Sequence, residues 1–283
     1  MLKERGIIIH AQDAGDYWAD RLEKLAFNAL PATVSPDMWT HQYVQMTNQV
    51  ECSRTPHQVF RTNNEEAHIF GLEPHFGCCT ANMGQGFPKF TLSSLYKTET
   101  GIACGIPLPI TLKTEVNGVA VTCKTITDYP FRGEVRFLFT AASPVSFDFT
   151  VRIPSHASSA KVNGKEVACG MYTLPLSVTD TTEITLSLDF ATHFETRPSG
   201  MLALWRGPLL YSLPIAERWE KREYERDGVA RKFPYCDYEL IGKSDWNYGF
   251  SDVMLEVEER EVTDVPFSSK NPPIVVKAKM KHI

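Results

Sequence analysis

The 283-residue sequence lacks three features that would each indicate a broad class of protein. No apolar run approaches the roughly 20 residues that a helix needs to span a bilayer, so we expect no membrane partner. A formal net charge of −5 gives no electrostatic reason to expect a nucleic acid partner. The first apolar stretch is too short for a signal peptide and no small-residue cleavage site follows it, which favours a cytoplasmic location.

The cysteines also lack the spacing of a disulfide framework or of paired Cys-x-x-Cys motifs. There are seven, an odd number, and only Cys78 and Cys79 are adjacent. Scattered free thiols fit a reducing compartment better than a disulfide-bonded secreted domain. Adjacent cysteines form a strained disulfide, but their thiolates are ligands that select zinc.

The residues around the cysteine pair predict a turn that leads into a helix. Gly77 precedes the pair, and Thr80-Ala81-Asn82-Met83 follows it. A thiol at a helix N-terminus has a lowered pKa, because the helix dipole and the free backbone N–H groups stabilise the thiolate. The pair could therefore supply metal ligands, a nucleophile or both. The alternatives are two buried structural cysteines or a purely structural zinc site.

Two helices are expected in the first hundred residues. The first covers residues 13–30, with Asp13 as N-cap and Pro31 as its end. Its apolar residues recur at helical spacing and form the face that packs against the core: Trp18, Leu22, Leu25, Ala26, Ala29 and Leu30. The charged residues fall on the other face, which is expected to be solvated: Asp20, Arg21, Glu23 and Lys24. The second helix is expected at residues 80–97, with an apolar face formed by Phe90, Leu92, Leu95 and Tyr96.

The segment 31–76 shows no periodicity and is too long for an ordinary connection unless it is functional. Aromatic rings and amides in it are what a sugar site uses, since rings stack on the sugar and amides pair with hydroxyls. Our candidate sugar contacts are Trp39, His41, Tyr43 and Asn48. An ordinary polar surface loop is the alternative. Glu65, Glu66 and Glu73 are individually more typical of surface carboxylates than of acids or metal ligands.

After residue 100 the spacing of the apolar residues changes from the helical period to strict alternation, which is typical of strands. Asn117-Gly118 and Asn163-Gly164 are hairpin signals, because Asn-Gly suits the type I′ turn. Alternating residues at 147–153 and 184–190 predict strands of an antiparallel β-sandwich. Further strands are expected at 201–215, broken at Gly207-Pro208, and at 253–257, whereas the charged segment 217–232 reads as a solvated helix or loop.

Several motifs, in the same order, resemble the β-L-arabinofuranosidase-like glycoside hydrolases of families 127 and 146. Residues 20–32 are similar to the helix that precedes their active-site loop, and residues 77–89 to their double-cysteine motif. The sequences TDYPF at 127–131, VRIPS at 151–155, VNG at 162–164 and RGPLLY at 206–211 resemble landmarks of their β-domains. The resemblance runs from about Asp16 to Tyr248.

This resemblance implies an α+β multidomain protein. Residues 1–96 would be the C-terminal helices of an (α/α)6 barrel, 97–195 a β-sandwich domain and 196–283 a truncated second β-rich domain. In the family, zinc is held by one glutamate and three cysteines, and hydrolysis is retaining. Carried onto this chain, Cys78 is the nucleophile and a zinc ligand, and Cys79 is a second zinc ligand. A separate glutamate acts as the acid/base.

The chain departs from the family pattern before the first helix. The family's Glu-x-Cys ligands and its acid/base glutamate precede that helix, but only residues 1–19 do so here, and they contain Glu4 and no cysteine. Glu51-Cys52 has the wrong spacing. We therefore expect part of such an enzyme, with a carbohydrate partner and self-association through uncovered helix faces. The alternative is a non-catalytic carbohydrate-associated β-sandwich module or an inactive remnant.

Overall fold

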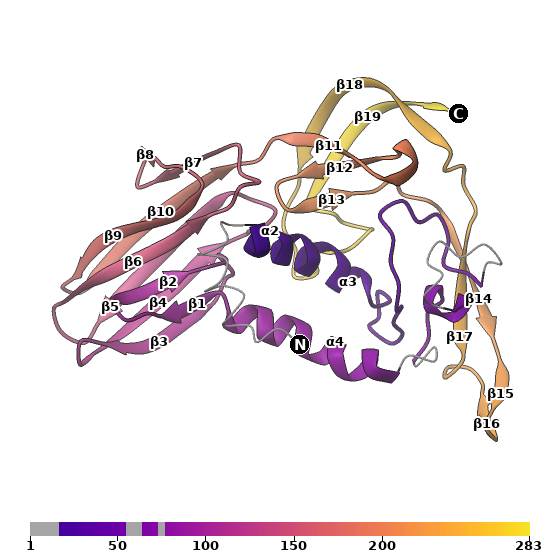
Figure 1. Cartoon of the computed structure of the whole chain (residues 1–283), viewed down its shortest axis with the longest axis horizontal. Coiled ribbons are helices and arrows are strands. Elements are labelled where there is room, and N and C mark those ends of the chain that lie inside the picture. The colour runs from indigo at the N-terminus through magenta and orange to yellow at the C-terminus, as the bar shows by residue number, and fades with distance from the viewer. Residues whose placement is uncertain (1–16, 55–63, 73–76) are drawn as a thin grey trace. The chain divides into compact units, whose positions relative to one another are not determined.

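The computed structural model describes residues 17–54, 64–72 and 77–283 of the chain (Figure 1). The chain divides into two compact units. The first consists of Met1–Phe27, Phe87–His193 and Trp205–Leu210, and the second of Asn28–Gly86, Phe194–Leu204 and Tyr211–Ile283. Within the described ranges, no helix is both long and apolar enough to cross a membrane.

The first unit is built on two β-sheets. One has four strands in the order β1-β2-β6-β9, with bounds Leu95–Lys97, Gly101–Cys104, Val145–Ile153 and Gly170–Val178. The other has the order β3-β4-β5-β10-β7-β8, with bounds Thr111–Val116, Val119–Thr127, Glu134–Ala141, Thr181–Asp189, Ser159–Val162 and Lys165–Glu166. Neighbouring strands are antiparallel except β2 and β6, which are parallel.

Aromatic side chains of β5 and β6 fill the space between these sheets. The ring of Phe149 lies 4.9 Å, centroid to centroid, from the rings of both Phe137 and Phe139, and all three are fully buried. The alternation of buried and exposed residues along β5 and β10 gives each strand one inward face. The predicted antiparallel β-sandwich is therefore confirmed.

The two Asn-Gly turns close their hairpins as predicted. Asn117 and Gly118 have φ values of 51° and 77°, and Asn163 and Gly164 have 48° and 76°. Positive φ at both central residues is the type I′ requirement, and it joins β3 to β4 and β7 to β8. A different constraint acts at Gly101, where an added Cβ would lie 2.0 Å from the backbone oxygen of Asp148, so that only glycine fits.

The first predicted helix is present but mixed in type. It runs as α2 (Tyr17–Lys24), a π-helical stretch (Leu25–Ala29) and α3 (Leu30–Ala32), and its predicted cap Asp13 lies outside the described residues. Proline has no N–H for the carbonyl four residues before it, and Pro31 is the second residue after the π-helical stretch. The helix ends at Ala32, one residue beyond that proline.

The predicted faces of this helix are wrong in part. Asp20 and Glu23 were assigned to solvent, yet both are buried. Trp18, assigned to the apolar face, is 48% exposed, and Leu25 is also exposed. The reason is a buried cation that the periodicity could not reveal, the guanidinium of Arg152.

The second helix, α4, runs from Gly77 to Leu92 and not from 80 to 97. It begins at the glycine before the cysteine pair, and the last predicted helical residues form strand β1 instead. Leu95 faces inward there and pairs with Cys104 of β2. Pairing with β2 thus outweighed the helical spacing of Leu92, Leu95 and Tyr96.

The second unit contains three two-stranded ladders. These pair β14 (Glu217–Arg222) with β17 (Asp237–Gly242), β15 (Tyr224–Arg226) with β16 (Val229–Arg231) and β18 (Tyr248–Glu259) with β19 (Ile274–His282). The charged segment 217–232 is thus mostly strand, so the predicted helix or loop is wrong there. Its charges pair across the ladder, as in the ion pair of Arg222 with Glu239.

The described part of the segment 31–76 attaches to β17. Single β-bridges join Cys52 to Leu240 and Phe70 to Tyr238. The buried residues Phe70, Cys236 and Tyr238 form a small core against which Cys52 and Leu240 pack. One 3₁₀ turn, Glu65–His68, is capped by the Asn64 side chain. The other described residues of the segment after Ala32 are irregular, as its lack of periodicity predicted.

Three short strands and a 3₁₀ turn occupy the stretch where the chain passes between the units. These are β11 (Thr192–Thr196), the turn Pro198–Gly200, β12 (Leu202–Arg206) and β13 (Leu209–Tyr211). The predicted break at Gly207-Pro208 separates β12 from β13. The strand expected at 253–257 lies within β18.

Candidate functional site

The adjacent cysteines lie in the first turn of α4. Cys78 is exposed and Cys79 is partly buried. Backbone N–H groups in the first turn of a helix have no carbonyl partner within it, so they favour negative charge on nearby groups. Both cysteines therefore lie in a helix turn that has free backbone N–H groups, and Cys78 is open to solvent.

Burial raises the pKa of the Cys79 thiol to about 11, and the neighbouring Cys78 adds to this rise. Without a nearby cation, Cys79 therefore stays protonated at neutral pH. A bound Zn²⁺ would supply the positive charge that makes a coordinating thiol lose its proton. Two adjacent thiols at a helix start are thus a chemically suitable donor set for zinc, although they provide two of the four ligands of a closed site.

The four predicted sugar contacts lie in the second unit and differ in exposure. Trp39 and Tyr43 are exposed, at 44% and 40%. Asn48 donates from Nδ2 to the Leu202 carbonyl at 3.2 Å. His41 is buried, and its backbone bridges to Val34 and Gly71, so this residue holds the segment together.

The carboxylates of the same segment have different surroundings. Glu66 lies 3.8 Å from the guanidinium of Arg54 and 3.7 Å from that of Arg226, which fits a structural ion pair. Glu73 and His75, which stand close to the cysteines in the sequence, lie outside the described residues.

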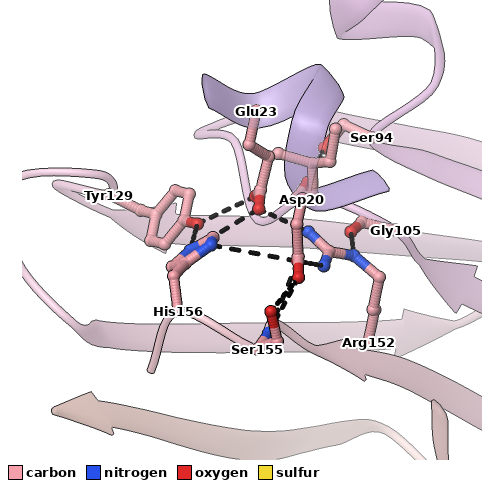
Figure 2. A network of polar contacts seen from close by, with 9 residues as sticks. Asp20, Glu23, Ser94, Gly105, Tyr129, Arg152, Ser155 and His156 are labelled. Carbon is pink, nitrogen blue, oxygen red and sulfur yellow. Dashed lines mark hydrogen bonds and ion pairs between the residues drawn. The ribbon is translucent and has the colours of Figure 1, made fainter. Parts of the chain in front are cut away.

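Sequence reasoning missed a buried polar cluster in the first unit (Figure 2). Arg152 of β6 lies between two carboxylates of α2: its Nη1 is 2.5 Å from Asp20 Oδ1, and its Nη2 is 2.5 Å from Glu23 Oε2. Its Nε donates to the Gly105 carbonyl at 2.9 Å. The backbone N–H and the hydroxyl of Ser155 donate to Asp20.

A tyrosine and a histidine complete this Asp20–Glu23–Arg152 cluster. Tyr129 donates from its hydroxyl to Glu23 Oε1 at 2.8 Å and lies 3.1 Å from His156 Nε2. Burial raises the pKa of Tyr129, with Glu23 adding to the rise. Burial lowers the pKa of His156, against the opposing effect of Glu23 and Asp20. Both rings are therefore neutral at pH 7.

The cluster resembles a metal site in its donor set but not in its charge. Ligand atoms of Asp20, Glu23 and His156 lie within 4.8 Å of one another. Burial by itself lowers the pKa of Arg152, but Glu23, Tyr129 and Asp20 outweigh burial and raise it. The guanidinium is thus a permanent cation between the two carboxylates, the role that a metal would fill. We interpret the cluster as a structural clamp that fastens α2 to the β-sandwich.

One sequence signal could have revealed the clamp. Asp20 and Glu23 are three residues apart on a helix, so their side chains share a face. Arg152 stands between two buried residues of β6, Val151 and Ile153. A charge in that position needs a buried counter-charge.

Comparison with known proteins supports the resemblance seen in the motifs. Residues 101–190 match the family model described as "Beta-L-arabinofuranosidase, GH127 middle domain". This stretch lies in the β-sandwich of the first unit. The predicted relationship to β-L-arabinofuranosidase-like glycoside hydrolases is confirmed. The comparison with curated proteins gives no match.

Solved structures share the fold over most of the chain. A GH127 β-L-arabinofuranosidase from Geobacillus stearothermophilus T6 is 17% identical with a TM-score of 0.57, covering 94% of this chain and 42% of that one. A glycoside hydrolase is 17% identical with a TM-score of 0.56, covering 80% and 45%. A GH127 β-arabinofuranosidase is 15% identical with a TM-score of 0.51, covering 93% and 42%. The chain thus spans less than half of the length of these structures.

Proposed function

We propose, on the premise that residues 101–190 form a GH127 middle domain, that this chain belongs to a retaining glycoside hydrolase acting on β-L-arabinofuranosides. The observation that carries the proposal is the Cys78–Cys79 pair in the first turn of α4, with Cys78 exposed. An exposed thiol in the first turn of a helix is accessible to a substrate, which a nucleophile requires. The (α/α)6 barrel to which α2 and α4 would belong is part of the proposal.

In the proposed reaction the Cys78 thiolate attacks the anomeric carbon. A carbon–sulfur bond forms while the bond to the leaving oxygen breaks, and that oxygen takes a proton from a carboxylic acid. Water then attacks the same carbon and loses its proton to the resulting carboxylate. The carbon–sulfur bond breaks, the thiolate is restored, and two displacements retain the anomeric configuration.

Cys78 and Cys79 would hold a Zn²⁺ ion in this proposal. The ion's chemistry is to keep coordinating sulfur deprotonated at neutral pH. Such help is needed in particular at Cys79, because burial raises the pKa of its thiol to about 11. Trp39 and Tyr43 would contact the sugar with their exposed rings, and His41 and Asn48 would support or extend that surface.

Two measurements test this proposal. Zinc content per chain should be near stoichiometric in protein purified without added metal, and the Cys78→Ser/Cys79→Ser variant should lose it. Cys78→Ser alone should abolish hydrolysis of an aryl β-L-arabinofuranoside by the active enzyme. Full activity in that variant would disprove the role of Cys78.

A second candidate function is a non-catalytic carbohydrate-associated module. This function is favoured because the family match covers residues 101–190 in the β-sandwich and does not include the helix that carries the cysteines. This function predicts sugar binding that is unaffected by a chelator and by Cys78→Ser. Loss of sugar binding on treatment with a chelator would count against it.

A further inference from the structure

Two exposed aromatic rings in the second unit come from segments far apart in the chain. Trp39 lies in the irregular segment before α4, and Tyr235 lies in the connection between β16 and β17. Their ring centroids are 5.9 Å apart with an interplanar angle of 52°. Trp39 is 44% exposed and Tyr235 is 56% exposed, so this contact leaves much of both side chains open to solvent.

The loop that carries Trp39 is held in one conformation by its own side chains. Asp37 Oδ1 accepts from the Ser35 hydroxyl at 2.5 Å and from the Trp39 N–H at 3.1 Å. The Ser35 hydroxyl oxygen accepts from the Thr40 N–H at 3.0 Å. Met38 has a φ of 59°, a left-handed conformation that is uncommon for a side chain of its size. A strained turn that persists is typical of functional sites.

A hydrogen bond to the connection between β16 and β17 also holds the indole of Trp39 in place. Trp39 Nε1 donates to the Pro234 carbonyl at 3.2 Å, next to Tyr235 in the chain. The same carbonyl accepts from the Tyr238 hydroxyl at 3.0 Å, and Tyr238 belongs to the small core of this unit. The indole is therefore held in place, and the backbone beside Tyr235 is tied to the same core, so a ligand would bind the Trp39 ring with little loss of side-chain entropy.

The size of the exposed surface favours a small ligand over a protein. A fully buried aromatic ring covers about 150–250 Å², so two half-exposed rings offer about 200 Å². A stable protein interface needs about 800 Å² from each partner. The ring of Phe233, two residues before Tyr235, is also exposed, but the ammonium of Lys221 lies over it, 3.7 Å from its centroid.

We propose that Trp39 and Tyr235 form a stacking platform for one sugar residue of a carbohydrate ligand. A sugar ring has an apolar C–H face that matches an aromatic face, while its hydroxyls stay at the edge in water. Asp37 is a positioning residue in this proposal, since it contacts the loop and not the ligand. The choice of a sugar as the ligand rests on the proposed function, but the platform uses neither cysteine.

The test is isothermal titration of the chain with an oligosaccharide of β-L-arabinofuranose. Trp39→Ala and Tyr235→Ala should each weaken binding about fivefold to tenfold, as expected for the loss of one aromatic contact. Tyr235→Phe should bind as the parent does, because stacking needs the ring and not the hydroxyl. Trp246→Ala is the matched control, since Trp246 is 52% exposed and should leave affinity unchanged.

Three outcomes would overturn the platform: no binding by the parent chain, parent-like affinity of both alanine variants, or an equal loss in the Trp246 control. Sedimentation velocity adds a fourth, since a dimer that Trp39→Ala converts to monomer would make the rings a protein interface. Zinc content separates this proposal from the proposed function. A chain that holds zinc through its cysteines but binds no sugar refutes only the platform, and the converse result refutes only the zinc site.

Discussion

Two polar groups of this protein, the Asp20–Glu23–Arg152 cluster and the Cys78–Cys79 pair, differ in whether they contain a cation. In the Asp20–Glu23–Arg152 cluster, both carboxylates contact one guanidinium, and all three side chains are nearly inaccessible to solvent. Cys78 and Cys79 lie at a helix start with one sulfur exposed, and burial raises the pKa of Cys79 to about 11. The first group contains its own cation, whereas the second gains from an added one. Removing that internal cation should destabilise the fold, whereas the second group is suited to act on a ligand.

The largest expected effect is the loss of stability when the Asp20–Glu23–Arg152 cluster loses its cation. Arg152→Met leaves Asp20 and Glu23 buried without their counter-ion, which should lower the free energy of unfolding by about 3–5 kcal/mol. Urea denaturation measures this loss. The matched control is Arg136→Met, which removes a cation paired with Glu183 at the surface and should leave the free energy of unfolding nearly unchanged.

Equal effects of Arg152→Met and Arg136→Met would contradict the structural clamp. A second variant keeps the test informative if Arg152→Met does not fold. Replacing all three members together, as Asp20→Asn/Glu23→Gln/Arg152→Met, removes the unpaired charges and should recover part of the lost stability.

A smaller effect is expected for zinc on the cysteine pair. Adding zinc to metal-free protein should raise the Tm, because a ligand that binds only the folded state stabilises it. Cys79→Ala should reduce this shift while leaving the Tm of the metal-free protein nearly unchanged. If Cys79→Ala lowers the metal-free Tm as much as the zinc-loaded one, Cys79 is a packing residue.

The rate at which the Cys79 thiol is alkylated at different pH values tests the same cysteine pair chemically. Its pKa in the folded chain is about 11, raised first by burial, against 9.0 for an ordinary cysteine. A raised thiol pKa favours the folded state below pH 9, and this contribution is lost as the pH rises from about 9 to 11. Alkylation of Cys79 by iodoacetamide, followed by mass spectrometry, should stay slow in metal-free protein until the pH nears 11. Rapid alkylation at pH 8 would contradict this.

The smallest effect is expected from His156. Burial lowers the pKa of its imidazole, so the neutral ring contributes stability above the pKa of the unfolded chain. That contribution is lost as the pH falls through the lower pKa of the folded state. Unfolding free energies measured from pH 7 to 4 should fall less steeply in His156→Gln. Identical slopes in the two proteins would show that His156 does not titrate with folding.

Much of the β-structure could be predicted from the sequence, because local rules determine it. Asn117-Gly118 and Asn163-Gly164 specify their turns through backbone conformation alone. The alternation along β6 and β10 specifies which side chains face inward. Gly207-Pro208 marks the break between β12 and β13, since proline lacks an N–H for the ladder.

The failures of prediction have a common physical cause, a partner distant in sequence. Asp20 and Glu23 are charged, so periodicity assigned them to solvent, but Arg152 more than 125 residues away makes their burial possible. The charged residues at 217–222 form a strand because Arg222 pairs with Glu239 on β17. No pattern in the sequence distinguishes Tyr235, since only the fold brings its ring next to that of Trp39. The roles of Cys78 and Cys79 stay a prediction.

The most direct test of the central claim is the zinc content of the chain purified without added metal, beside the Cys78→Ser/Cys79→Ser variant. We predict close to one zinc ion per chain in the parent protein and background levels in the variant. No zinc in the parent, or equal zinc in both proteins, would contradict the claim that the cysteine pair holds a metal in this chain.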